Sequence, residues 1–301
     1  MDINPILLLA ALMVASTPIL LAAIGELVVE RSGVLNLGVE GMMIVGAVCG
    51  YIAGHSSGNP YLGFVGAAAA GAALSLIFAV LTQFLLTNQV ATGLGLTMFG
   101  LGLSSLIGQG AKGSPDLTVS KLHIPLLADI PVVGPILFQH DVMVYLSVAI
   151  VAGVWAFLKY SRAGLILRAV GENHDAAHAL GYNVRAVRVL AIMFGGACAG
   201  LAGAYISLVR VPQWIDGITA GAGWIALAIV VFASWKPWRL IAGAYLFGGV
   251  TVLQLNLQAE GLKIPVEYLS MAPYLATIVV LVMIRAGRAP ASLGKSFHPS
   301  T

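Results

Sequence analysis

The residues of this chain that could do chemistry are few, and one group of them lies near the N-terminus. Glu26 and Glu30 are four residues apart, with Arg31 beside them, at the end of a long apolar segment. Ionisable groups at membrane depth are costly and usually functional, so two carboxyls at this spacing could form a proton relay. They could also be a local ion-pair cluster with Arg31 that holds the following loop, and we favour that interpretation.

A second group contains His174 and His178, which share one helix face with Asp175 between them. This spacing could hold a metal, but a zinc site needs three or four ligands and no further Cys or His is near in sequence. We therefore predict a solvated helix face and no metal. Gly294-Lys295-Ser296 resembles the end of a phosphate-binding loop, but Ala289 stands where the pattern needs its first glycine. We expect no cofactor in this chain and no ATPase site.

The composition indicates a membrane protein. Hydrophobic residues make up 59% of the 301 positions and charged residues 9%, and the mean hydropathy is +0.96. Soluble domains carry roughly 25% charged residues, so the soluble classes are excluded. The chain has no nucleophile elbow and no HExxH motif, which makes an intramembrane enzyme a weak alternative.

The apolar segments predict an all-α fold, a polytopic bundle of about nine transmembrane helices (eight to ten). A helix needs roughly 20 apolar residues to cross the bilayer core. The candidate spans are 5–24, 34–54, 61–86, 89–109, 141–159, 188–209, 219–234, 238–256 and 268–285. We expect residues 1–285 to form one transmembrane domain and residues 286–301 to be a disordered cytoplasmic tail.

The distribution of charge predicts the orientation, because cytoplasmic loops are enriched in Lys and Arg. With the N-terminus outside and the C-terminus cytoplasmic, four of the 15 basic residues fall outside and the other 11 inside. The four are Lys112, Lys121, Arg210 and Lys263. This orientation makes residues 160–188 a cytoplasmic loop and residues 110–140 an extracytoplasmic one. Trp235 and Trp238 then flank Lys236 at the inner interface.

Several polar side chains fall within the predicted spans, where they must face protein or water. We select Asn36, Glu40, Asn88, Gln89 and Asn256 as candidates for a substrate path. Amides with few charges suit a neutral, hydroxylated solute better than an ion.

The cytoplasmic loop 160–188 has helical spacing in its interior. Its apolar positions Ala176, Ala177, Leu180 and Val184 are expected on one face. An amphipathic helix between two spans is a surface on which another protein can dock.

Three motifs together resemble a known family. They are Gly25-Glu26-Leu27 with the run from Glu30 to Met43, the segment from Arg168 to Val184, and Gly223-Trp224-Ile225-Ala226-Leu227-Ala228. The chain is similar to bacterial ATP-binding cassette (ABC) importer permeases of the branched-chain amino acid, simple-sugar and nucleoside branch. It looks most like the nucleoside or simple-sugar permease subunits.

The resemblance implies a multi-pass subunit of the bacterial inner membrane with a weak inverted repeat. It implies a second permease, identical or homologous, and cytoplasmic ATPase subunits that hydrolyse the ATP. It also implies an extracytoplasmic substrate-binding protein that delivers a small-molecule solute, and gives no role to nucleic acid.

The resemblance further implies a coupling helix in the loop 160–188, docked on the ATPase. Gly171 and Gly181 would bound this helix, and Glu172 or Asn173 would cap its N-terminal end. The face from Ala177 to Leu180 would then sit in a groove of the ATPase.

Two other classes of function remain as alternatives. An ion-gradient-driven secondary transporter would use Glu26, Glu30 or Glu40 as its coupling site. A membrane scaffold or receptor subunit would carry no solute.

Overall fold

The helices of this protein were located in a computed structural model. It describes residues 5–111, 117–123, 125, 127–259 and 288–298, and positions 268, 271, 272, 275, 278, 279 and 282. The α-helices are α1 (Pro5–Arg31), α2 (Val39–Ser57), α3 (Pro60–Ala79), α4 (Gln89–Gly108), α5 (Val142–Tyr160), α6 (Arg162–Glu172), α7 (His174–Ala179), α8 (Val184–Tyr205), α9 (Ala222–Phe232) and α10 (Pro237–Ala259). Three π-helical turns are η1 (Val80–Phe84), η2 (Gly134–Phe138) and η3 (Ile206–Arg210). Within the described ranges, the single β-type pairing is an isolated bridge between Lys121 and Asp141.

Six helical segments are long and apolar enough to cross a membrane, which makes the chain a polytopic helical membrane protein. They are Pro5–Arg31, Pro60–Phe84, Gln89–Gly108, Val142–Tyr160, Val184–Arg210 and Pro237–Gln258. The count of nine spans and the orientation stay predictions, and most of the predicted span 268–285 lies outside the described residues. Helix α9 has only 11 residues, or about 16 Å, so it extends over roughly half the bilayer core.

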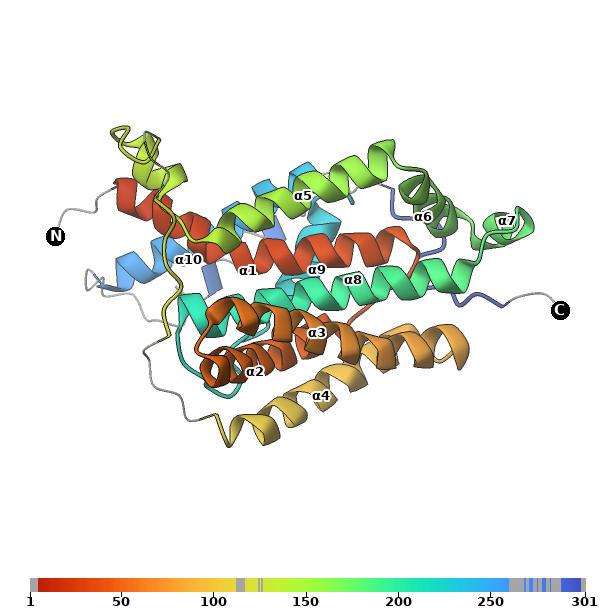
Figure 1. Ribbon diagram of the computed structural model, residues 1–301. Coiled ribbons are helices and arrows are strands. Elements are labelled where there is room, and N and C mark those ends of the chain that lie inside the picture. The colour runs from red at the N-terminus through yellow and green to blue at the C-terminus, as the bar shows by residue number, and fades with distance from the viewer. Residues whose placement is uncertain are drawn as a thin grey trace.

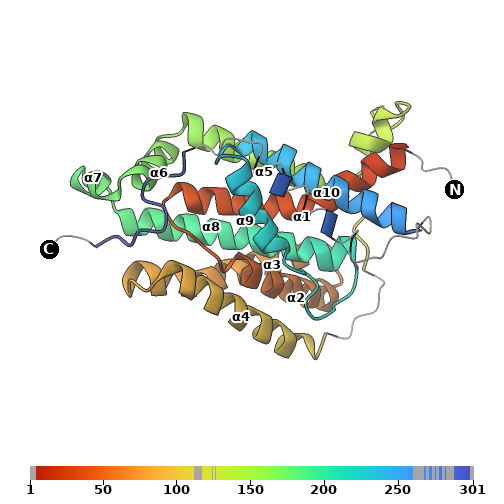
Figure 2. The same cartoon turned by 180° about the vertical axis from the view of Figure 1, so that it is seen from behind.

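The helices run side by side along one direction, with α1 and α8 in the middle (Figure 1). Helices α2, α3 and α4 cover one side of this pair, and α5 and α10 lie on the other. The opposite view shows the short helix α9 crossing in front of α1 and α8 (Figure 2). The N-terminal end of α1 lies at one end of the bundle, while α6, α7 and residues 288–298 lie at the other.

Glycines allow α2, α3 and α8 to touch through their backbones. A Cβ added to Gly46 of α2 would clash with the backbone of Gly200 in α8, and one added to Gly71 of α3 would clash with the carbonyl of Gly196. A Cβ on Gly203 would overlap the carbonyl of Met43. Small residues promote such close helix packing in membranes, where no hydrophobic effect drives helices together.

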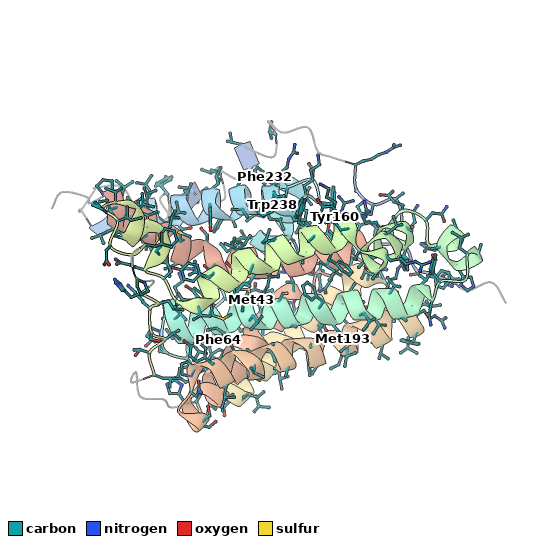
Figure 3. The ribbon with its side chains drawn as sticks, turned by 45° about the horizontal axis from the view of Figure 1, so that its top comes forward. Met43, Phe64, Tyr160, Met193, Phe232 and Trp238 are labelled. Atoms are coloured by element: carbon teal, nitrogen blue, oxygen red, sulfur yellow. The ribbon has the colours of Figure 1, made fainter. Side chains whose placement is uncertain are left out.

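Aromatic rings gather where α5 and α10 lie next to one another. The Trp155 ring centroid lies 5.5 Å from that of Tyr160 and 5.8 Å from that of Trp238, and both partners are labelled in Figure 3. Trp238 is exposed, but Trp235 is only 4% exposed. The indole of Trp235 turns inward to donate to Glu30, and the place of Trp235 at the inner interface stays a prediction.

The C-terminal residues 288–298 are packed against the protein, which differs from the disordered tail that we predicted for 286–301. The amide of Ser292 donates to the Gly171 carbonyl (2.9 Å), and the amide of Gly294 donates to the Gly33 carbonyl (3.1 Å). Phe297 is 4% exposed. Backbone hydrogen bonds and one buried ring hold a segment whose composition is otherwise polar.

Candidate functional site

The loop between α5 and α8 contains two short helices, and polar side chains define where each begins. Ser161 accepts a hydrogen bond from the Gly164 amide at the start of α6 (2.9 Å). Asn173 accepts from the Ala176 amide at the start of α7 (3.0 Å). Such caps satisfy amides that have no partner within the helix. The predicted cap by Asn173 is confirmed.

Helix α7 (His174–Ala179) lies between Gly171 and Gly181 as predicted, although Gly171 itself belongs to α6. The backbone of Asn173 is extended, which ends α6 and starts the six-residue α7. Glu172 is the last residue of α6 and is exposed. Gly171 packs so tightly that a Cβ would clash with the Arg31 carbonyl of α1. Gly181 follows α7 with φ +86°, a left-handed conformation that suits glycine and turns the chain toward α8.

The predicted common face of Ala176, Ala177, Leu180 and Val184 is wrong, because the turn at Gly181 separates its members. Ala177 is 2% exposed and Val184 1%, and both pack with Val170 and Phe297 of the same chain. Leu180 is 76% exposed. The surface that α7 offers to another protein therefore includes Leu180 and excludes Ala177, and this projecting helix lies at the end of the bundle (Figure 1).

The inner side of α7 contacts a buried arginine of α8. Arg188 is fully buried, and it donates to the carbonyls of Ser32 (3.3 Å) and Lys295 (3.0 Å). Its Nη2 lies 3.3 Å from Nδ1 of His174. Because a guanidinium only donates, Nδ1 must accept and the ring is unprotonated there.

The two histidines of α7 differ in environment, so our prediction of one solvated face is wrong for His174. Burial, followed by the charge of Arg188, holds the pKa of His174 below its usual value. Its Nε2 faces Asp175 at 3.5 Å. His178 is exposed, and its ring centroid lies 5.2 Å from that of Phe297.

Glu40 joins the N-terminal ends of α2 and α9. Its Oε1 accepts from the Thr219 hydroxyl (2.6 Å) and the Gly221 amide (2.9 Å), and its Oε2 accepts from the Gly223 amide (2.7 Å). The side chain is buried. A carboxylate at a helix N-terminus satisfies free amides and complements the helix dipole. Glu40 thus caps a helix that lies about 180 residues further along the chain.

The other selected polar residues have hydrogen-bond partners within the protein. Asn36 donates to Glu26 (3.4 Å) and accepts from the Gly38 amide (3.0 Å). Gln89 accepts from the Leu35 amide (2.8 Å). Asn36 and Gln89 therefore stabilise the loop between α1 and α2. Asn88 caps α4 at an exposed position. Asn256 donates to a carbonyl of its own helix, α10.

Glu30 and Arg31 both meet Trp235. The indole of Trp235 donates to Glu30, and the guanidinium of Arg31 donates to the Trp235 carbonyl (2.7 Å from Nη2). In the part of the chain that the structure describes, no salt bridge joins Glu26, Glu30 and Arg31. The interpretation as an ion-pair cluster is therefore wrong, because Glu30 and Arg31 form hydrogen bonds with uncharged groups of Trp235.

A cavity of about 170 Å³ lies between α1, α9 and α10, beside the Glu40 cap. Its polar lining consists of Arg210, Thr219, Thr251 and Gln254. We had counted Arg210 only as a loop charge and did not select the others. Thr251 and Gln254 are three residues apart and so share one helix face, and this spacing could have identified them as lining residues.

Comparison with known proteins identifies the family. Residues 8–286 match the model of the family described as "Branched-chain amino acid transport system / permease component". The chain belongs to this permease family. The resemblance stated from the three motifs is confirmed.

The permease has relatives over nearly its whole length. It is 41% identical over 296 residues to a putative glucose ABC transporter permease of Haloferax volcanii, covering 91% of this chain and 90% of the relative. It is 33% identical to a nucleoside ABC transporter permease of Lactococcus lactis (97% and 94% covered). It is 34% identical to a guanosine ABC transporter permease of Bacillus subtilis (93% of both chains). No solved structure matches.

This permease is thus a subunit of an ABC importer, a class that works with ATPase and binding-protein partners. Sequence reasoning missed two residues at the end of the bundle where α7 lies. Arg188 was counted only for topology, although it lies in the second turn of the apolar helix α8. Phe297 is the one Phe, Trp or Tyr in residues 286–301, and a single aromatic in a polar tail is a signal for an anchor.

Proposed function

We propose that this permease forms the path by which a simple sugar or a nucleoside enters a bacterial cell across the inner membrane. One observation supports this substrate class. Relatives that align with more than nine-tenths of the chain are named as glucose, nucleoside and guanosine permeases. An extracytoplasmic binding protein delivers the solute, and a second permease completes the path.

The energy comes from separate cytoplasmic ATPase subunits that dock on α7, and this chain carries no ATPase site of its own. Support comes from the position of α7, which projects at one end of the bundle (Figure 2). The exposed residues Glu172, at the end of α6, and Leu180, directly after α7, flank this helix and form the docking surface. Ala177 anchors the helix from beneath through its contact with Val184 and Phe297.

The solute path includes the cavity beside the Glu40 cap. Thr251 and Gln254 offer a hydroxyl and an amide there, and Arg210 offers further donors. Such groups suit the hydroxyls that sugars and nucleosides share. Asn36, Glu40 and Gln89 act on the path by fixing the ends of its helices, and their contacts support that role.

The test is reconstitution with the ATPase and the binding protein encoded beside this chain. Uptake of labelled glucose and guanosine into vesicles should require ATP and persist when ionophores remove ion gradients. Uptake that follows an ion gradient without ATP would instead support the secondary transporter.

A charge on α7 tests the docking surface. Leu180→Asp should abolish co-purification of the ATPase while the chain still inserts into the membrane. Leu122→Asp, the same change at another exposed leucine, is the matched control. Normal ATP-driven uptake by Leu180→Asp would refute the assignment of α7.

A further inference from the structure

The C-terminal strap (residues 288–298) crosses the base of α7 and reaches the α1–α2 loop (residues 32–38). Ser292 donates through its amide to Gly171, and its hydroxyl lies 3.4 Å from the His174 amide. The amide of Gly294 donates to Gly33. The ring of Phe297 then fills the space beneath α7, with its centroid 5.5 Å from that of His174.

Arg188 lies where these segments meet. Its three partners belong to three different parts of the chain: Ser32 in the α1–α2 loop, Lys295 in the strap and His174 in α7. Burying a charge is costly unless its donors are satisfied. Because each partner satisfies a different donor of one buried guanidinium, withdrawing any segment alone leaves an unpaired buried group. The three segments should therefore move together.

The α1–α2 loop leads directly to the ends of two helices in the bundle. Its residue Asn36 accepts from the Gly38 amide, where α2 begins. At the second residue of α2, Glu40 holds the N-terminus of α9. Contacts thus run without a break from the inner side of α7 to the wall of the polar cavity.

We propose that the C-terminal strap and Arg188 position α7 and join it to the α1–α2 loop, so that movement of α7 reaches the N-terminal ends of α2 and α9. This inference rests on the proposed docking of the ATPase at α7. It assigns Phe297 and Arg188 as positioning residues that touch neither solute nor ATPase.

The test compares solute transported per ATP hydrolysed in vesicles. Phe297→Ala should leave ATPase co-purification intact and the hydrolysis rate within about twofold, because the exposed side of α7 is unchanged. Transport per ATP should fall at least fivefold. Phe297→Leu restores an apolar contact and should recover most of the ratio.

Lys295→Ala is the matched control, because Arg188 uses only the backbone carbonyl of this exposed residue. Its transport ratio should equal that of the native chain. Arg188→Gln should lower the ratio as Phe297→Ala does. An unchanged ratio in Phe297→Ala, with the ATPase bound, would overturn the proposal.

A disulfide tests the strap without any ATPase. A Cβ on Gly33 would lie 3.2 Å from Cβ of Ser292, slightly closer than the separation of about 3.5–4.5 Å in disulfides. Gly33 has φ +88°, so a cysteine there is strained, but both cysteine pairs compared below share this substitution. Gly33→Cys with Ser292→Cys should cross-link in membranes, and Gly33→Cys with Ala291→Cys, at an exposed strap position, should cross-link less. Equal cross-linking would overturn the docked strap. If the native chain showed no ATP-driven uptake, the proposed function would be refuted. The docked strap would still stand if the cross-link formed.

Discussion

Replacing Glu40 by glutamine should destabilise the protein by removing part of the α9 cap. The carboxylate accepts from two backbone amides, those of Gly221 and Gly223, through different oxygens. A glutamine amide has one oxygen and one NH2 group. Whichever way it is oriented, one of the two backbone N–H groups faces an NH2 donor and loses its partner.

The size of the effect follows from the number of donors left without an acceptor. One buried unsatisfied donor costs about 1–3 kcal/mol, so Glu40→Gln should lose about that much. Glu40→Ala leaves the Thr219 hydroxyl and both amides unpaired, for a loss of about 3–9 kcal/mol. At about 2 °C per kcal/mol for a chain of this size, Tm should fall by about 2–6 °C and by at least about 6 °C, respectively.

The assay is thermal unfolding of the purified permease in detergent. Glu172→Gln makes the same chemical change at an exposed position, and its Tm should stay within about 1 °C of the native value. If Glu40→Gln unfolded at the native Tm, Glu40 would not cap α9 and the reasoning would fail.

Three further predictions concern packing, capping and pH. Gly46→Ala overpacks the α2–α8 contact and should cost about 1–3 kcal/mol, whereas Gly95→Ala, with nothing near its Cβ, should not lower Tm. Asn173→Ala removes the α7 cap, worth about 1 kcal/mol, and should speed amide exchange in α7; Asn173→Asp should keep native exchange. The lowered pKa of His174 means that the unfolded chain binds its proton first, so stability is full above about pH 6.5 and falls as pH drops toward the folded pKa. Tm measured from pH 8 to pH 5 should show this fall, His174→Gln should reduce it, and an equal fall in both would contradict the assignment.

Local sequence signals predicted the long helices well. The span 141–159 was observed as Val142–Tyr160, because Asp141 and Ser161 end the apolar run and cap the neighbouring helices. The cap at Asn173 was likewise readable from residue type and position. Membership of the permease family could be recognised because its motifs are contiguous in sequence.

Contacts between distant parts of the chain could not be predicted in the same way. Glu40 and Gly223 are 183 residues apart, and Arg188 and Lys295 are 107 apart. Polar residues inside a span signal only that partners exist, so Asn36 and Gln89 were selected for a solute path although they brace a loop.

The backbone contacts among α2, α3 and α8 restrict how this permease can change access from one side of the membrane to the other. Helices without side chains between them have no rotamers to rearrange, and sliding would drive the backbone atoms of Gly46 and Gly200 together. The three helices must therefore travel as one rigid block. The surfaces that shear during transport have to lie outside that block, either around α9 and α10 or where this subunit faces the second permease.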